Sequence, residues 1–392
     1  MGKGLEMMSG PGNATRAATR IRIDLLRRQL LIALPAMFVA GPLWTAAQRT
    51  APPQRKRGSA VVSVRDHGAR GNGTSDDTDA LQRAIDALPD EGGTVEVPAG
   101  TYLIDPTRRP SLRNRMHLKL ASDAQLKAKP NAEERAYVLM ASGVADVEIS
   151  GGRILGERDA HLGGTGEWGH GIALYGARRV TVRDINISRC WGDGISIGGK
   201  RANPKDKREA PAPSQDIVLA GVTCTGNRRQ GLSIGHSRDV RVYDCEFSDT
   251  AGTKPECGID MEPDAAGDIE RVLIEHCRIR GNAGSGIQVF KRVRDVTIRG
   301  CTIEGNRGFG VLAVAAVDGV IENNEIHDNG YNGVMMRTET RNYRVSRNRF
   351  RANATRRRPG AKGAKAPAQS HVKRGENTSE INVVDNQFLD GG

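Results

Sequence analysis

The segment of residues 258–311, GIDMEPDAAGDIERVLIEHCRIRGNAGSGIQVFKRVRDVTIRGCTIEGNRGFGV, carries the pattern that decides the fold. A glycine followed by an aliphatic residue opens each repeat, and two more short runs of alternating apolar and polar residues follow it. Such alternation is typical of β-strands. Three short strands per repeat predict a three-sided coil of parallel strands. In this segment the opening pairs are Gly258-Ile259, Gly286-Ile287 and Gly310-Val311.

The same repeat extends in both directions from this segment. The spacings between opening glycines lie between 23 and 28 residues, with one exception of 37 residues. The exception contains the polar stretch Lys200–Pro213, and removing its fourteen residues restores a spacing of 23. We therefore predict an all-β solenoid over residues 111–354, with Lys200–Pro213 as an inserted loop beside it. The other opening pairs are Gly171-Ile172, Gly194-Ile195, Gly231-Leu232 and Gly333-Val334.

Two columns of like residues follow from this register. An asparagine recurs four residues before the opening glycine, where its amide can form hydrogen bonds along a stack of tight corners. Aligning the turns also places three cysteines in one column, with Val222 before them and Asn324 after them. We predict an unbridged thiol stack for these three and leave disulfides open for the rest. The asparagines are Asn227, Asn282, Asn306 and Asn329; the stacked cysteines are Cys245, Cys277 and Cys301, and the others are Cys190, Cys224 and Cys257.

The formal net charge of +12 lies mostly outside the predicted coil. Residues 1–58 carry a net +8, and the stretches 200–210 and 355–378 carry +3 and +6, which leaves the rest near −5. A nucleic-acid-binding protein would carry its basic groups on the folded body, so we expect no nucleic-acid partner. The stretch 355–378 lacks periodicity and is predicted to be disordered, and residues 379–392 are predicted to form the last strand.

The first residues have the organisation of an export signal. Arg27-Arg28 precedes an apolar run from Leu30 to about Trp44 and small residues at Ala46-Ala47. We predict a signal peptide over residues 1–47, of the twin-arginine type or an uncleaved anchor, and a periplasmic or secreted protein. The apolar run is short for a membrane span, so none is expected after signal removal. Residues 48–60 read as a flexible linker.

A different pattern precedes the repeats. Residues 64–88, VRDHGARGNGTSDDTDALQRAIDAL, predict a strand, a glycine-rich turn and a helix that begins near Ser75, Asp76 or Asp77. The helix has an apolar stripe, and we expect residues 61–110 to cap the open end of the coil. The stripe consists of Ala80, Leu81, Ile85 and Leu88.

This segment resembles the N-terminal signature of the pectate-lyase superfamily, which includes polygalacturonase-like hydrolases, lyases, alginate epimerases and phage tailspikes. With the repeats, the resemblance extends from Val61 to the C terminus. It implies a right-handed coil, a polysaccharide partner, and a groove over the first strand of each turn. It does not select the reaction.

Within the repeat, the second and fourth residues after the opening glycine are predicted to face outward. On one strand these positions hold Asp260 and Glu262, which stand roughly 6.5–7 Å apart at strand spacing, within the range of inverting glycosidases. Repulsion between such carboxylates raises one pKa and keeps a general acid protonated. Ser233, Gln288 and Phe290 on neighbouring turns are predicted to contact the sugar, Phe290 by stacking.

The same acids allow a second interpretation. Asp264 follows them closely, and the three carboxylates together could hold Ca²⁺ in a lyase. Lys254 and Lys291 are then the candidate bases that contact the substrate. For a hydrolase we expect no cofactor.

A second cluster precedes the opening glycines of successive turns. His170 and Asp193 are expected to pair, with Gln230, Arg228 and Arg229 beside them. Asp193, in WGDGISIGG, resembles the aspartate of the NTDG element of polygalacturonases, which implies a catalytic role. The sequence departs from that family because Gln230 stands where its catalytic histidine is expected. His170, Gln230 and Arg229 are predicted to bind substrate.

These observations favour an exported, polygalacturonase-like hydrolase with Asp260, Glu262 and Asp193 as catalytic residues. A metal-assisted lyase or epimerase on a uronate polymer is the first alternative. A non-catalytic glycan-binding surface protein is the second. The substrate is expected to be a polysaccharide, of acidic or neutral type.

Overall fold

The computed structural model describes residues 51–200, 211–263, 267–354, 356 and 371–389. The predicted signal peptide, Asp264 and most of the two basic stretches lie outside these residues. Within the described part of the chain, no helix has both the length and the apolar character that a membrane span requires.

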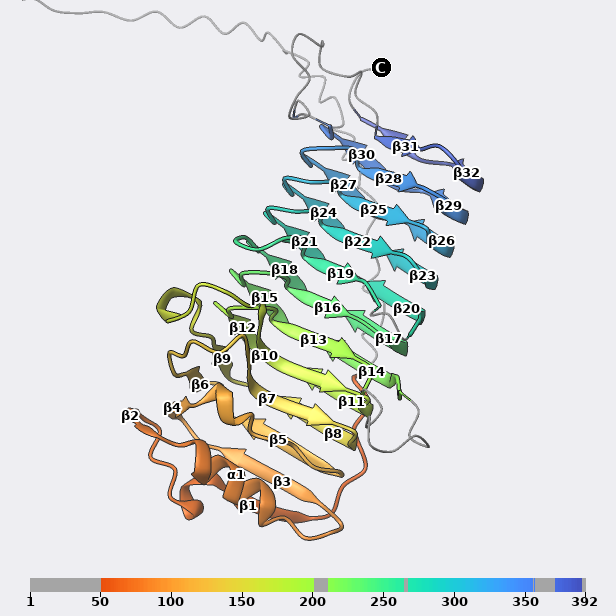
Figure 1. Ribbon diagram of the computed structural model, residues 1–392. Coiled ribbons are helices and arrows are strands. Elements are labelled where there is room, and N and C mark those ends of the chain that lie inside the picture. Colours follow the sequence, from red (N-terminus) through yellow and green to blue (C-terminus); the bar gives the residue numbers. More distant parts are fainter. Residues whose placement is uncertain (1–50, 201–210, 264–266, 355, 357–370, 390–392) are drawn as a thin grey trace, which may run out of the picture. The chain divides into compact units, whose positions relative to one another are not determined.

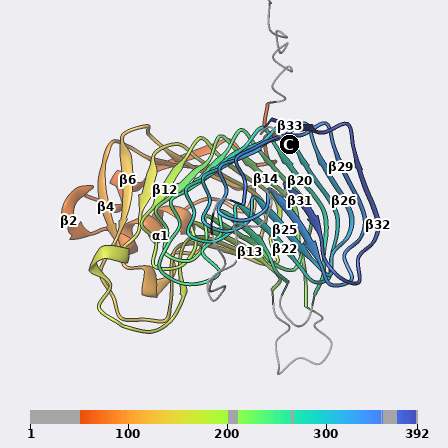
Figure 2. The ribbon, with the colours of Figure 1, turned by 90° about the horizontal axis from the view of Figure 1, so that it is seen from above.

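Three parallel sheets form the three sides of a right-handed coil, which confirms the predicted solenoid (Figures 1 and 2). Sheets A and B each have 12 strands and sheet C has 9. Sheet A contains β1 (Ala60–Ser63), β3 (Gly93–Val97), β5 (Met116–Leu120), β8 (Ala145–Ser150), β11 (Arg178–Arg183), β14 (Ser214–Ala220), β17 (Ser237–Tyr243), β20 (Ile269–Glu275), β23 (Val293–Arg299), β26 (Val317–Glu322), β29 (Arg341–Ser346) and β32 (Ser379–Val384). Sheet B contains β2 (Asn72–Asp76), β4 (Gly100–Ile104), β6 (Ala124–Ala128), β9 (Arg153–Leu155), β12 (Asn186–Ser188), β15 (Thr223–Thr225), β18 (Glu246–Ser248), β21 (Arg278–Arg280), β24 (Thr302–Glu304), β27 (Glu325–His327), β30 (Arg349–Arg351) and β33 (Gln387–Phe388). Sheet C contains β7 (Arg135–Ser142), β10 (Trp168–Tyr175), β13 (Ile195–Gly198), β16 (Leu232–Ile234), β19 (Ile259–Met261), β22 (Ile287–Phe290), β25 (Val311–Val314), β28 (Val334–Arg337) and β31 (Val372–Arg374).

The opening glycines stack because neighbouring turns approach too closely for a side chain. A Cβ at Gly194 would lie 2.7 Å from the carbonyl oxygen of Gly231, and one at Gly258 would lie 2.9 Å from that of Gly286. The aliphatic residue after each glycine points into the core, where Ile195 and Ile259 are completely buried. The opening position is therefore a glycine in each of these turns because the coil leaves no room for a side chain there.

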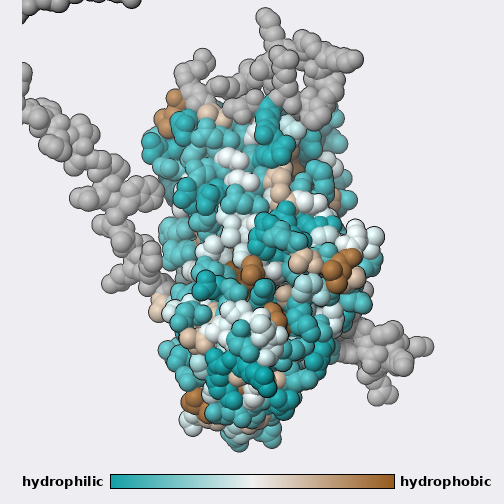
Figure 3. All heavy atoms as spheres, turned by 90° about the vertical axis from the view of Figure 1, so that its left-hand side faces the viewer, coloured by the Kyte–Doolittle hydropathy of each residue, from teal (hydrophilic) through white to brown (hydrophobic). Residues whose placement is uncertain are grey.

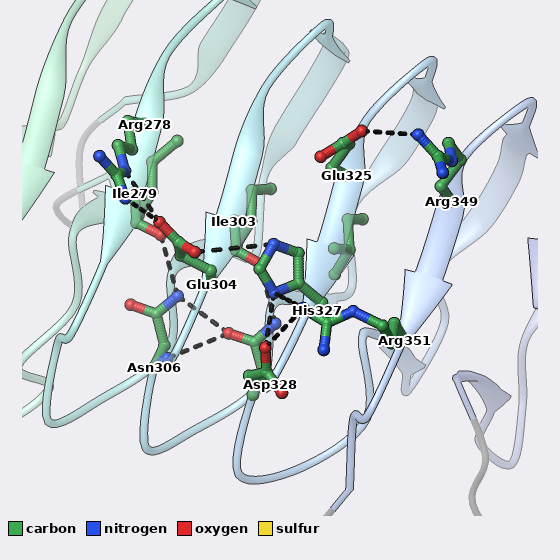
Figure 4. Close-up of polar contacts among 12 residues, drawn as sticks. Arg278, Ile279, Ile303, Glu304, Asn306, Glu325, His327, Asp328, Arg349 and Arg351 are labelled. Atoms are coloured by element: carbon green, nitrogen blue, oxygen red, sulfur yellow. Dashed lines mark hydrogen bonds and ion pairs between the residues drawn. The ribbon is translucent and has the colours of Figure 1, made fainter. Parts of the chain in front are cut away.

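The predicted asparagine stack is present, and its members from Asn282 to Asn329 are bonded to one another. Asn306 Oδ1 accepts from the side chain of Asn282 (2.8 Å), and Asn306 Nδ2 donates to Asn329 Oδ1 (2.9 Å) and to the Ile279 carbonyl (3.1 Å). Figure 4 shows the bond between Asn306 and Ile279. Such ladders give buried amides their partners and fix the vertical register of the turns. A second ladder links Asn324 to Asn348 (2.9 Å).

The cysteine column is confirmed, and all six cysteines are buried free thiols. Asn324 continues the column, because its Oδ1 accepts from the backbone N–H of Cys301 (2.8 Å). The Cys277 thiol donates to the carbonyl of Glu275 (3.1 Å) within the same turn. Burial raises the pKa of the Cys277 thiol, so these side chains act as small apolar core residues.

The outward face of sheet B is held by ion pairs between neighbouring strands. Arg278 pairs with Glu304 (2.6 Å), and Arg349 pairs with Glu325 (3.0 Å). His327 joins Glu304 and Asp328 on the same face (Figure 4). The view of this side of the molecule is mostly hydrophilic (Figure 3). We place no functional site here because these charges satisfy one another.

The N-terminal segment corrects one predicted boundary. Residues 60–104 supply β1 to β4, so the coil begins at Ala60 rather than at residue 111. Within the segment lie the 3-10 helices η1 (Val64–His67) and η2 (Pro106–Arg108) and the helix α1 (Thr78–Asp86), and η3 (Arg158–Ala160) follows β9. The four residues of the apolar stripe of α1 are buried in the core. That α1 shields the first turn is our interpretation of this packing.

The described part of the predicted linker, residues 51–60, is not flexible. Arg55 is 8% exposed and donates to Thr181 Oγ1 (2.8 Å) and Asp216 Oδ2 (2.7 Å) on sheet A. Arg57 pairs with the buried Glu148 (2.8 Å). The sequence predicted a linker here because charged, proline-containing segments resemble linkers in composition. The prediction was wrong because Arg55 and Arg57 bind carboxylates that are distant in the sequence. Likewise, residues 372–374 of the stretch predicted to be disordered form β31.

Candidate active site

A groove of about 630 Å³ lies over the outward face of sheet C, which runs through the middle of the view in Figure 1. Strands β7, β10, β13, β16 and β19 supply most of its lining. Aromatic, cationic and carboxylate side chains meet there. The lining residues are Arg135, Tyr137, Ser142, Trp168, His170, Tyr175, Asp193, Ser196, Ile197, Gly198, Gly199, Lys200, Arg229, Ser233, Gly235, His236, Asp260, Glu262 and Pro263.

The predicted register of this face is confirmed. Ser233 pairs with Asp260, and Asp260 pairs with Gln288, on adjacent strands. The backbone N–H of Glu262 donates to the carbonyl of Ile234 (3.0 Å), which sets Glu262 beside Gly235. Asp260 and Glu262 therefore enter the same groove from one strand and its extension.

Asp260 has the environment of a carboxyl group that keeps its proton. It is 2% exposed, and its two oxygens accept from Gln230 Nε2 (2.9 Å) and Gln288 Nε2 (3.0 Å). Burial, and after it the charge of Glu262, raise the pKa of Asp260 to about 7, although the positive charge of Arg229 opposes both. Glu262 itself is exposed to the groove. One acid is thus shielded from water and its neighbour is not.

The second predicted cluster lies in the same groove. His170 and Asp193 lie together as expected, through the backbone: the Asp193 N–H donates to His170 Nδ1 (3.1 Å), so this nitrogen carries no proton toward Asp193 Oδ2, which lies 3.4 Å away. Arg229 contacts Asp193 (3.3 Å) and donates to Ser233 Oγ (3.3 Å). Burial lowers the pKa of His170 to about 4, so the imidazole is neutral near pH 7.

Arg229 connects the two carboxylates that lie on different turns. The charges of Asp193 and Asp260 both raise the pKa of its guanidinium, and Glu167 lies 3.3 Å from its Nε. Arg229 is therefore influenced by both carboxylates, and the charge of Asp193 also raises the pKa of Asp260 directly. The side chain of Arg229 is 17% exposed, so part of it remains accessible from the groove.

Several predicted site residues lie elsewhere. Gln230 is completely buried and bonded at both ends, so we revise it from a substrate contact to a support for Asp260. Phe290 and Lys291 do not line the groove, and the Lys291 ammonium sits over the Phe290 ring (4.8 Å). The side chain of Lys254 is 89% exposed, pairs with Glu256 (3.5 Å) and does not line the groove either. Gln288 reaches the site only through Asp260.

The structure adds an aromatic end to the groove that sequence reasoning missed. The guanidinium carbon of Arg135 lies 3.8 Å from the ring centre of Trp168. Tyr137 stacks on His170 at 5.4 Å and meets Tyr175 edge-on at 5.8 Å. The available signal was the alternation in residues 135–142, which aligns with residues 168–175.

The predicted Ca²⁺ site includes Asp264, which is not among the residues that the structure describes. Among the described residues, no three His, Cys, Asp or Glu side chains form a group that could hold a metal ion. Asp264, the third predicted ligand, lies outside them. Asp260 and Glu262 supply two carboxylates at the place where such an ion would bind.

Comparison with known proteins agrees with this fold. The right-handed β-helix region model matches residues 132–262 and 257–392, and a rhamnogalacturonase A/epimerase, pectate-lyase-like model matches residues 61–148. Protein YclG of Bacillus subtilis is 30% identical over 258 residues, which cover 59% of this chain and 43% of that protein. The chain thus spans less than half of this relative.

Two solved structures share the architecture at low sequence identity. The A-module of the mannuronan C-5 epimerase AlgE4 of Azotobacter vinelandii is 18% identical, with a TM-score of 0.59 over 85% of this chain and 98% of that one. The tailspike gp49 of Acinetobacter baumannii bacteriophage Fri1, a capsular polysaccharide depolymerase, is 14% identical, with a TM-score of 0.59 over 84% and 63%. The chain therefore belongs to the right-handed β-helix family and begins its coil with a pectate-lyase-like segment.

Proposed function

We propose that the protein is a polysaccharide-active enzyme that hydrolyses glycosidic bonds, with Asp260 as general acid and Glu262 as general base. The observation that carries the proposal is the buried Asp260 carboxyl, whose pKa is raised to about 7, at the wall of the groove. A general acid must hold its proton near the working pH, and a pKa near 7 provides this.

The arrangement suits hydrolysis with inversion. Protonation of the glycosidic oxygen by Asp260 makes the sugar a better leaving group, while Glu262 takes a proton from the attacking water. Side chains two positions apart on a strand stand roughly 6.5–7 Å apart, which leaves room for that water. Because the Asp193 carboxylate contacts Arg229 and the Asp193 backbone N–H donates to His170, we assign Asp193 to holding the substrate-facing Arg229 in place.

The rest of the groove provides surfaces that sugars bind. Trp168 and Tyr175 are aromatic, and such rings can stack on the apolar faces of sugars. Arg229 and Ser233 provide donors near the acids. The names of the two structural relatives, an epimerase of mannuronan and a depolymerase of capsular polysaccharide, support a polysaccharide substrate.

A lyase or epimerase acting on a uronate polymer is the second candidate, and the cationic lining of the groove favours it. Arg135, Lys200 and Arg229 all line it and would neutralise a uronate carboxylate. In that reaction a base removes the proton beside the carboxylate, and Ca²⁺ held by Asp260, Glu262 and Asp264 would assist. Elimination leaves an unsaturated sugar, which hydrolysis does not.

One screen separates these candidates. Purified protein is incubated with neutral and acidic glycans, and new reducing ends and unsaturated products are measured together, with and without chelator. The proposal predicts reducing ends without unsaturation, insensitive to chelator, that disappear in Asp260→Asn and persist in Glu325→Gln, a matched change on sheet B. Unsaturated products lost on chelation would replace it with the lyase, and binding with neither product would replace it with an epimerase or a glycan-binding protein, which NMR of the recovered polymer distinguishes.

We also infer that the protein acts outside the cytoplasm, because residues 1–47 have the organisation of an export signal. N-terminal sequencing of protein recovered from the cell envelope and medium tests this. A mature chain beginning near residue 48 is expected, and a full-length chain retained in the cytoplasm would contradict the inference.

A further inference from the structure

The carboxamide of Gln230 has an orientation that its neighbours fix. The backbone N–H of Cys257 donates to Gln230 Oε1 (2.9 Å), and Gln230 Nε2 donates to Asp260 Oδ2 (2.9 Å). A backbone N–H can only donate, so the oxygen of the amide must face Cys257 and its NH₂ group must face Asp260. Gln230 is completely buried, which leaves water no access to exchange these bonds.

Gln288 holds the other oxygen of the same carboxyl group under a weaker constraint. Its Nε2 lies 3.0 Å from Asp260 Oδ1, and the residue is half-buried. Among the described contacts, no backbone donor fixes the oxygen end of this amide. Gln288 can therefore turn by 180° and present its oxygen to a proton on Oδ1.

We propose that Gln230 and Gln288 are positioning residues that decide which oxygen of Asp260 carries its proton. Gln230 reserves Oδ2 as a hydrogen-bond acceptor, so the proton of the neutral acid resides on Oδ1. Gln288 adapts to both states of the acid. Its amide oxygen accepts from Oδ1 when Asp260 is neutral, and its NH₂ group donates to Oδ1 when Asp260 is ionised.

This arrangement makes the two amides unequal in their effect on the acid. Gln230 can only donate, and a donor stabilises the charged form of a carboxyl group more than the neutral form. Gln288 serves both forms, and water can replace it because it is partly exposed. Loss of Gln230 should therefore raise the pKa of Asp260 more than loss of Gln288 does. That Asp260 then delivers its proton to a sugar rests on the proposed function, whereas its titration does not.

The test measures the titration of Asp260 directly in the full-length protein. Aspartate labelled with ¹³C at the carboxyl carbon is followed by NMR between pH 4 and 9, and the signal absent from Asp260→Asn identifies the group. Gln230→Met is expected to raise the pKa of Asp260 by about one pH unit, because it removes one hydrogen bond to a charged group. Gln288→Met is expected to raise it by less than half as much, and Gln215→Met on sheet A should leave it unchanged.

Equal shifts in the two variants, or a larger shift in Gln288→Met, would overturn the proposal. An unchanged or lowered pKa in Gln230→Met would do the same. If Gln230→Met fails to fold, a shift of one pH unit or more in Gln288→Met still contradicts it, and a small shift in that variant supports it. If the screen finds a cleaved glycan, the pKa of the alkaline limb of its kcat/KM profile should follow the NMR values, because the general acid loses its proton there. Absence of activity would defeat the proposed function and leave this titration result standing.

Discussion

Replacing Asp260 by asparagine is expected to change how the folding stability depends on pH. The pKa of Asp260 rises from 3.8 to about 7 on folding because the carboxyl is buried. Well below pH 3.8 both states hold the proton, and ionisation of Asp260 does not change the stability. As the pH rises from there through 7, the unfolded chain has released its proton while the folded state still holds it, so the folded state loses relative stability. A pKa difference of one unit corresponds to about 1.4 kcal/mol, so the loss is about 4 kcal/mol.

Asparagine cannot ionise, so the variant escapes this loss. The free energy of unfolding of Asp260→Asn minus that of the wild type should therefore increase by about 4 kcal/mol between pH 4 and pH 8. Glu157, whose pKa burial also raises to about 7, is present in both proteins and cancels in the difference. Guanidinium unfolding followed by the fluorescence of Trp168 and Trp191 measures it. A difference that is constant over this range would refute the buried-acid reasoning.

Three further predictions concern the coil. Asn306→Ala removes side-chain bonds to Asn282, Ile279 and Asn329. Denaturant titration should show a free energy of unfolding that is lower by about 3–5 kcal/mol. The control Asn186→Ala, at an exposed asparagine, should change it by less than about 0.5 kcal/mol. Equal effects would contradict the ladder. Gly194→Ala places a Cβ 2.7 Å from a backbone oxygen and should cost about 2 kcal/mol or more by the same measurement, and a neutral effect would show that the turns can separate. Arg55→Ala should expose residues 51–58 to limited proteolysis, detected by mass spectrometry, and an unchanged digestion pattern would argue against the docking of this segment.

The sequence could predict which side chains stack in columns because every turn of a solenoid has to satisfy the same packing constraints. Each opening glycine sets the phase of a strand, and alternation then assigns every side chain to the core or the surface. This reasoning places Ser233, Asp260 and Gln288 in one column, and the strand register confirms it.

Alternation gave less information where the chain leaves the strand. Gln230 precedes its strand in a turn, so its inward direction depends on the backbone N–H of Cys257 rather than on parity. The sequence pattern does not predict Tyr137 in the groove because its strand, β7, lacks the opening glycine. Val138 of β7 stands beside Gly171 of β10. The anchoring of Arg55 by Asp216, 161 residues away, leaves no local pattern at all.

The rate at which Asp260→Asn cleaves a glycan that the wild type cleaves is the most direct test of the central claim. Proton donation by a positioned acid contributes about 10²- to 10⁴-fold, so the variant should lose activity by that factor while its circular dichroism and its unfolding midpoint at pH 4 match the wild type. A variant that retains more than about a tenth of the wild-type rate would contradict the assignment of Asp260 as the acid.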